Sequence, residues 1–331
     1  MMDIESKRRI LQAVEHRRAE RRRFLRYAGT ATAMAGGLSL LAACDDDDDG
    51  DVVTPTPTPT PTPTASSGIA DVNVLNFALN LEYLEAQFYS FATTGQSLPV
   101  DMLGGVGRAG AVQGGRAVTF TDPVVAQYAR EIAYNERHHV AFLREALGSA
   151  AIAQPAINIG GDAAGPFTAA ARSAGVVGSN DTFDPYASDE NFLLAAYLFE
   201  DVGVTAYKGA APLLTNPTYV DAAAGILATE GYHAGLLRTA LYSKGIEMPS
   251  LITSANRISD ARDSLDGSSD LDQGITRDGN ANLVPADEDG IAFSRSTGQV
   301  LNIVYLNAAS TGSGGFFPAG VNGAFVTSGP A

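Results

Sequence analysis

Four apolar segments with helical periodicity lie between residues 70 and 245, and each carries a glutamate in the middle of its apolar face. The predicted helices cover about 71–93, 122–147, 188–213 and 217–244. Their glutamates are Glu82, Glu136, Glu200 and Glu230. In the second and fourth segments a histidine, His139 or His233, follows three residues later and therefore shares the face of its glutamate. A chain with this pattern must bring several carboxylates into its own core.

These carboxylates need a partner of opposite charge. An unpaired buried carboxylate destabilises a fold by roughly several kcal/mol even after relaxation. No Lys or Arg lies in the predicted stripes, so divalent metal ions are the natural counterions. Four carboxylates and two imidazoles suit two metal ions such as iron or manganese. The alternative is a helical bundle with ordinary surface glutamates, which requires all four stripes to be misplaced.

The second half of this region repeats the first. LEYLEAQFY (81–89) and FEDVGVTAY (199–207) both place a tyrosine seven residues after a glutamate, and NERHH (135–139) and TEGYH (229–233) both contain E-x-x-H. This order predicts two helical hairpins, related by a pseudo-twofold axis, whose polar side chains meet at one centre. Tyr89 and Tyr207 would then either hydrogen-bond a metal-binding carboxylate or serve as plain core aromatics.

This set of motifs resembles the ferritin-like di-iron proteins, which include bacterioferritins, rubrerythrins and manganese catalases. The resemblance implies an all-α, antiparallel four-helix bundle over 69–248, with a long crossover between the second and third helices. It also implies two iron or manganese ions per chain, with Glu136 and Glu230 bridging them. The implied metal ligands are Glu82, Glu136, His139, Glu200, Glu230 and His233.

A narrower resemblance follows from the loops. The connection 94–121 is long and Gly-rich where ferritins have a short loop. FEDVGVTAYKGAAPLL and VLNIVYLN…GGFFPAGVNG are similar to secreted ferritin-like proteins named after plant desiccation-related proteins. The implied activity is oxidation of the metal pair by peroxide or dioxygen, with Fe(II) as reductant or substrate, or destruction of peroxide. The alternatives are an inherited site that no longer turns over and a non-catalytic protein that protects the cell envelope during drying or oxidation.

Three further polar residues lie near the predicted ligands. Glu85 is one turn from Glu82, where two other helices carry histidine. It is either an additional ligand, as the resemblance to rubrerythrins implies, or a partly exposed carboxylate. His138 lies about 100° around the helix from His139, so we expect it at the surface or behind a ligand. Asp201 is predicted at the rim of the site.

The N-terminal region has the features of an export signal. RRRFLR (21–26), with Arg21 and Arg22, resembles the twin-arginine pattern, and LAAC, ending at Cys44, resembles the lipobox of bacterial lipoproteins. The resemblance implies a signal peptide over 1–43, lipidation of Cys44 and a location on the periplasmic side of a bacterial membrane. An N-terminal membrane helix or a disordered leader is the alternative. Residues 44–68, with a run of five aspartates (45–49) and a Thr-Pro run, are predicted to form a stiff tether.

Charge and the remaining sequence limit the partners. The chain of 331 residues has a net charge of −15, and nine Lys/Arg against four Asp/Glu in its first 43 residues leave about −20 for the rest. Such an acidic body disfavours nucleic acid. Oligomers are compatible with the sequence, but an anchor, a tether and large loops would obstruct a closed ferritin cage. In the extension 249–331, Ser296 and Gln299 predict a capping box and a fifth helix, whereas 258–291 is predicted as a wrapping loop.

Overall fold

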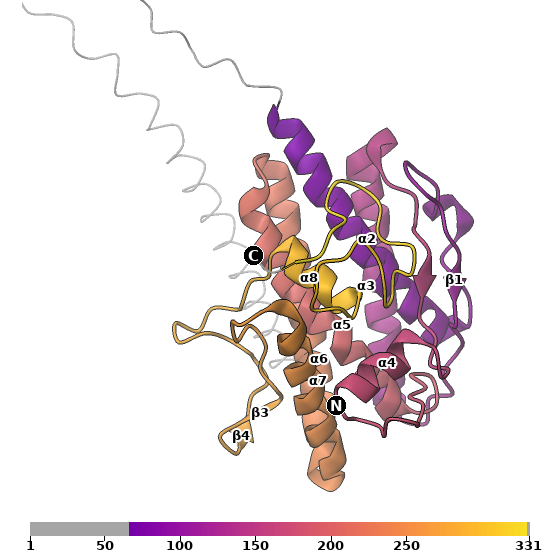
Figure 1. The fold of residues 1–331 in the computed structure, drawn as a ribbon, viewed down its shortest axis with the longest axis vertical. Helices are drawn as coiled ribbons and strands as arrows, with labels where there is room; N and C mark the ends of the chain where they lie inside the picture. Colours follow the sequence, from indigo (N-terminus) through magenta and orange to yellow (C-terminus); the bar gives the residue numbers. More distant parts are fainter. Residues whose placement is uncertain (1–65, 330–331) are drawn as a thin grey trace, which may run out of the picture. The chain divides into compact units, whose positions relative to one another are not determined.

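Four long helices form the core of the computed structural model, which describes residues 66–329 (Figure 1). They are α2 (Ser66–Thr94), α3 (Pro123–Leu147), α5 (Asp189–Ala210) and α6 (Pro217–Glu247). The shorter helices are α4 (Pro166–Ser173), α7 (Pro249–Asp266) and α8 (Thr297–Val304), with 3-10 turns η1 (Val100–Met102), η2 (Gly148–Ala150) and η3 (Ala211–Leu213). The two-residue strands are β1 (Val112–Gln113), β2 (Ile157–Asn158), β3 (Thr276–Arg277) and β4 (Asn280–Ala281). The predicted all-α, four-helix architecture is confirmed.

The predicted export signal lies outside the described residues, and so do Arg21, Arg22, Cys44 and the Thr-Pro run. Within 66–329, none of the helices combines the length and the apolar character that crossing a membrane requires.

Side-chain caps explain why three of the long helices begin where the sequence predicts. Asp122 accepts hydrogen bonds from the backbone N–H groups of the first turn of α3, and Ser188 and Asn216 do the same for α5 and α6. These caps satisfy donors that have no partner within the helix. A proline in the first turn of α3 and of α6 adds a backbone already fixed in a helical conformation.

The helices form two antiparallel hairpins. Asn76, near the start of α2, donates to the carbonyl of Ala150, just beyond the end of α3, at 3.0 Å. At the other hairpin, Lys244 near the end of α6 lies 3.2 Å from Glu190 at the start of α5. Lys244 also lies 3.0 Å from Asp122, the cap of α3. Therefore α3 and α5 begin at the same end of the bundle, and the chain must cross its whole length between them, as predicted.

The crossover packs along one side of the bundle (Figure 1). Strand β2 in the crossover pairs in parallel with β1, which belongs to the connection between α2 and α3. Helix α4, also in the crossover, places Phe167 5.4 Å from Phe88 of α2 between ring centroids. The Gly-rich connection and the crossover therefore support each other and cover the first hairpin.

The C-terminal extension is part of the core. Phe316, from the GGFFPAG segment, lies with its ring centroid 4.9 Å from that of Phe199 and 5.0 Å from that of Phe167. Helix α8 is the predicted fifth helix, and its capping box between Ser296 and Gln299 is confirmed. The extension thus supplies one wall of the same hydrophobic core as the bundle.

A buried ionic cluster ties this extension to the bundle. Its members are three arginines and three aspartates: Arg238, Arg262, Arg295, Asp201, Asp266 and Asp272. Arg262 of α7 lies 2.7 Å from Asp201 of α5 and 2.8 Å from Asp272. Its guanidinium also lies 4.5 Å from the centre of the Tyr197 ring. The equal numbers of opposite charges make this cluster neutral as a whole.

Two expectations from the sequence are wrong here. Asp201 is 6% exposed and pairs with arginines, so it does not lie at the rim of the glutamate cluster. Residues 258–266 belong to α7 and not to a loop. The buried face of α7 includes Arg262 and Asp266, and these charges obscure the apolar periodicity by which the helix could have been recognised.

We expect the ionic cluster to be required for stability. Arg262→Ala leaves Asp201 and Asp272 buried with less compensation, and breaking a buried pair in this way destabilises a protein by about 3–5 kcal/mol. Chemical denaturation measures the change, with Arg130→Ala at an exposed position of α3 as the matched control. A loss below ~1 kcal/mol for Arg262→Ala would show that the cluster does not hold the extension in place.

Candidate metal centre

Six side chains from all four long helices converge in the middle of the bundle. They are Glu82 of α2, Glu136 and His139 of α3, Glu200 of α5, and Glu230 and His233 of α6. The four glutamates are 0% exposed and the histidines at most 9%. The structure therefore brings together every residue that the sequence analysis placed at one centre.

Their nitrogen and oxygen atoms form two overlapping groups. One contains Glu82, Glu136, His139 and Glu230, the other Glu136, Glu200, Glu230 and His233, and within each group the candidate ligand atoms lie within 4.8 Å of one another. His139 Nδ1 is 3.2 Å from Glu82 Oε2, and His233 Nδ1 is 3.2 Å from Glu200 Oε2. Glu136 and Glu230 belong to both groups, and this is the arrangement that two bridging carboxylates would have.

Two tyrosines hold the outer carboxylates from the opposite hairpin. Tyr89 of α2 donates its hydroxyl hydrogen to Glu200 Oε1 of α5 at 2.5 Å. Tyr207 of α5 donates in the same way to Glu82 Oε1 of α2. This exchange follows the twofold repeat in the sequence. The sequence left open whether these tyrosines hydrogen-bond a carboxylate or are plain core aromatics. In the structure both of them hydrogen-bond a carboxylate.

Burial opposes the ionisation of most carboxyl groups in and beside the cluster. Burial raises the pKa of Glu82 to about 7. Burial, and next the charges of neighbouring carboxylates, raise the pKa values of Glu85 and Glu230 well above their usual range. The pKa of Glu200 is raised by the same burial. Without a cation, the cluster must therefore retain protons at neutral pH.

The two histidines lower the pKa of Glu136, which lies between them. Burial lowers the pKa of an imidazole, but nearby carboxylates outweigh it and raise the pKa of His139 to about 11 and that of His233 to about 10. Burial would likewise raise the pKa of Glu136, yet the two imidazoles hold that pKa well below its usual range. Glu136 is thus the carboxylate that stays ionised most readily.

The side-chain oxygens of Glu136 and Glu230 are the atoms of the cluster that most need a cation. All four are buried and accept no hydrogen bond of normal geometry from residues 66–329, although His233 Nδ1 lies 3.1 Å from Glu136 Oε1. Buried carboxylate oxygens without partners are strongly unfavourable. Metal ions shared by Glu136 and Glu230 would satisfy them, and the donor set of carboxylates and imidazoles suits iron or manganese. The residues present therefore fit a two-metal site.

The remaining polar residues near the cluster differ in position. Glu85 is 5% exposed but belongs to neither group of four, so its role as an additional ligand stays a prediction. His138 is exposed, its ring centroid lies 4.0 Å from that of Tyr134, and it points away from the cluster, in agreement with the sequence analysis.

Two residues of the site were missed in the sequence. Asn135 places its Nδ2 3.1 Å from Nε2 of His233, so it can orient that imidazole. At Gly203, a Cβ atom would lie 2.2 Å from Glu230 Oε2, so any side chain would displace that carboxylate. A glycine inside a helix costs about 1 kcal/mol relative to alanine, and this was the available signal for a close approach.

Comparisons with known proteins agree with this geometry. The family model described as ferritin-like domain matches residues 70–243. The chain is 30% identical to desiccation-related protein PCC13-62 of Craterostigma plantagineum, over 77% of this chain and 83% of that protein. It is 27% identical to ferritin-like catalase Nec2 of Nesocodon mauritianus, over 77% of this chain and 84% of that protein. No solved structure matches the chain.

The family match covers residues 70–243, which include all six side chains of the cluster, and each of the two relatives matches 77% of the chain. The sequence, the fold and the buried carboxylate–histidine cluster agree with it. The chain belongs to the ferritin-like domain family.

Proposed function

We propose that this protein is an exported, lipid-anchored di-metal protein whose centre reacts with peroxide or dioxygen. The observation that carries the proposal is the pair of overlapping four-residue groups with Glu136 and Glu230 in common. Iron or manganese, two ions per chain, are the metals that this donor set favours. The anchor at Cys44 and a location on the periplasmic side of a bacterial membrane belong to the same proposal, and they rest on the motifs of the N-terminal region.

The chain would hold the metals through residues with distinct roles. Glu136 and Glu230 would bridge the two ions, Glu82 and Glu200 would each bind one, and His139 and His233 would each complete one side. When bound, two redox-active ions held by shared carboxylates would supply two electrons to one oxidant. Glu85 would be an additional ligand on the side of Glu82.

The surrounding residues prepare the site before any metal binds. Tyr89 and Tyr207 fix one oxygen of each outer glutamate, so its other oxygen is left for a metal. Asn135 orients the imidazole of His233. The complete burial of the glutamates excludes bulk water, which strengthens each of these interactions.

One relative supports the redox reading, because its name describes it as a ferritin-like catalase. The other favours a second candidate function, because its name relates it to desiccation. In that second candidate the metals are structural or simply sequestered, and the protein protects the envelope without turnover.

An assay of metal content and reactivity separates the two functions. We expect the mature protein, produced with its own export signal, to contain two Fe or Mn ions per chain by elemental analysis. Its metal-dependent absorbance should change when peroxide or dioxygen is added. Bound metal with no such change would reject the redox function in favour of the protective one. A protein without metal, whose melting is insensitive to chelators, would reject both metal-based functions.

Glu136→Gln tests the bridging role. The substitution keeps the shape of the side chain but removes its negative charge, so we expect the loss of at least one of the two metal ions per chain. Glu131→Gln, at an exposed position of the same helix, is the matched control and should retain both ions. Unchanged stoichiometry in Glu136→Gln would contradict the ligand assignment.

Removal of the metals should make stability depend on pH in a defined direction. A carboxyl group with a raised pKa, such as Glu82 with a pKa of about 7, makes the folded protein less stable as the pH rises from 4.5 toward that value. A raised imidazole pKa, as His139 has at about 11, gives stability that is complete below 6.5 and is lost as pH rises further.

Both contributions have the same sign between pH 5 and 9. We therefore expect the free energy of unfolding of chelator-treated protein to fall across this range, and to fall less in metal-loaded protein, where the cations replace the protons. Denaturation midpoints that rise with pH in the chelator-treated protein would be incompatible with this electrostatic account.

A further inference from the structure

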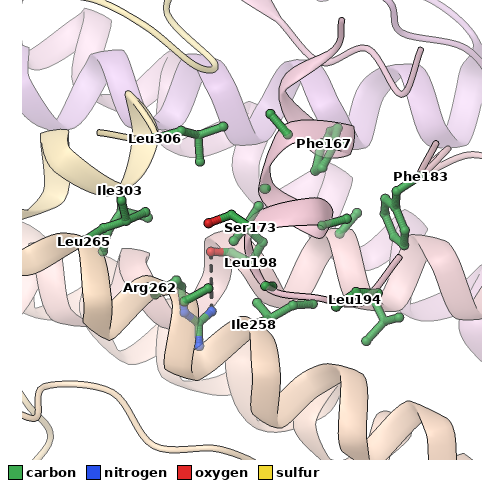
Figure 2. A pocket seen from close by; sticks show the side chains of 17 residues that line it. Phe167, Ser173, Phe183, Leu194, Leu198, Ile258, Arg262, Leu265, Ile303 and Leu306 are labelled. Carbon is green, nitrogen blue, oxygen red and sulfur yellow. Dashed lines mark hydrogen bonds between the residues drawn. The ribbon is translucent and has the colours of Figure 1, made fainter. Parts of the chain in front are cut away.

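A cavity of about 110 Å³ lies between α4, α5, α7 and α8, and we call it the outer cavity (Figure 2). Apolar side chains dominate its lining, among them Phe167, Leu198, Leu265 and Ile303. The cavity reaches the protein surface at α4, because Ser173 in its lining is exposed.

The one charged group in this lining is neutralised. Arg262 turns its guanidinium to the carbonyl oxygen of Leu198, at 3.4 Å (Figure 2). It also donates to the carbonyl oxygen of Tyr197, at 2.5 Å, and pairs with two aspartates. The cavity therefore meets mainly the apolar stem of Arg262. A lining of this kind disfavours ions and accommodates small apolar molecules.

A second cavity of about 20 Å³, the inner cavity, lies next to the first. Leu198 and Ile303 line both cavities, so these two side chains form the wall between them. Leu84, Val202 and Phe316 complete much of the apolar lining of the inner cavity. A volume of about 10–15 Å³ admits one water-sized molecule, so the inner cavity can hold one small molecule at a time.

The inner cavity ends at the metal centre. Glu85 and Gly203 are both in its lining. A Cβ atom at Gly203 would lie 3.5 Å from Glu85 Oε1 and 2.2 Å from Glu230 Oε2, a shared carboxylate of the site. The glycine therefore leaves the space in which the inner cavity and the cluster meet.

We propose that the outer and inner cavities form a route for dioxygen between α4 and the metal centre. The inference rests on the proposed redox function and adds to it the route and the molecule that uses the route. Dioxygen is small, uncharged and apolar, as this lining requires. The route serves equally for dioxygen that enters as oxidant and for dioxygen that leaves as the product of peroxide destruction.

Leu198 and Ile303 would control passage along this route. Both are buried side chains, at 7% and 2% exposure, and both line the two cavities, so a change of their rotamers would connect the cavities. The C-terminal extension supplies Ile303 and Phe316, so the extension forms part of the route as well as part of the core. Metal ions would need a different path, because the lining of the outer cavity offers them no carboxylate or imidazole.

Dioxygen can be located directly through its paramagnetism. The full chain, loaded with diamagnetic zinc and labelled at leucine and isoleucine methyl groups, is studied by NMR under dioxygen pressure. We expect the methyl groups of Leu198 and Ile303 to relax several-fold faster than that of Ile132, which is 0% exposed in α3 and lines neither cavity. Equal enhancement at all three residues would overturn the proposal. This measurement needs no variant and no turnover.

A variant that blocks the outer cavity provides the second test. Ala170 is half-buried on α4 and lines this cavity, so Ala170→Phe should fill it and reduce the dioxygen effect at Leu198 and Ile303 several-fold. Ala141→Phe, at an exposed position of α3, is the matched control and should leave that effect unchanged. An unchanged effect in folded Ala170→Phe would overturn the route.

The two proposals can fail separately. If the wild-type protein binds metal but never reacts, while Ala170→Phe still removes the dioxygen effect, the redox function is rejected and the route stands. If the wild-type protein reacts with dioxygen and folded Ala170→Phe reacts at the same rate, the route is rejected and the redox function stands.

Discussion

Negative charge buried at one point on four helices is the constraint on which this structure depends. Glu82, Glu136, Glu200 and Glu230 meet in a space closed to solvent, where their mutual repulsion and the loss of hydration oppose folding. Each feature around them reduces that opposition. The antiparallel hairpins place two histidines between the carboxylates, and two tyrosines bind the outer oxygens. Within residues 66–329, the oxygens of Glu136 and Glu230 still accept no hydrogen bond of normal geometry, although the two imidazoles lie close to them.

The same protein contains a buried ionic cluster in which its own arginines neutralise its own aspartates. Around Arg262, three arginines and three aspartates pair within the chain and join α7 and the extension to the bundle. The contrast is informative, because it shows that this fold can provide arginines for buried carboxylates. At the glutamate cluster, no arginine from the described residues 66–329 pairs with a carboxylate. We therefore attribute the unbalanced charge there to metal binding, and the balanced charge around Arg262 to stability.

Much of this arrangement could be predicted from the sequence, since helical periodicity and two E-x-x-H motifs are local patterns. They gave the four helices, the crossover and the six converging side chains. The burial of Asp201 and the helix α7 were not predicted, because their buried charges pair with residues distant in sequence. The periodicity of apolar residues contains no information on such pairs. The cavities that meet at Leu198 and Ile303 depend on how α4, α5 and α8 pack, which no local pattern encodes.

The most direct test of the central claim is anomalous X-ray diffraction from crystals of the protein purified without added metal. We expect two anomalous peaks per chain, each in contact with Glu136 and Glu230, one beside His139 and the other beside His233. The absence of peaks at this position, with the six side chains arranged as described here, would contradict the account. It would mean that protons alone stabilise the buried carboxylates.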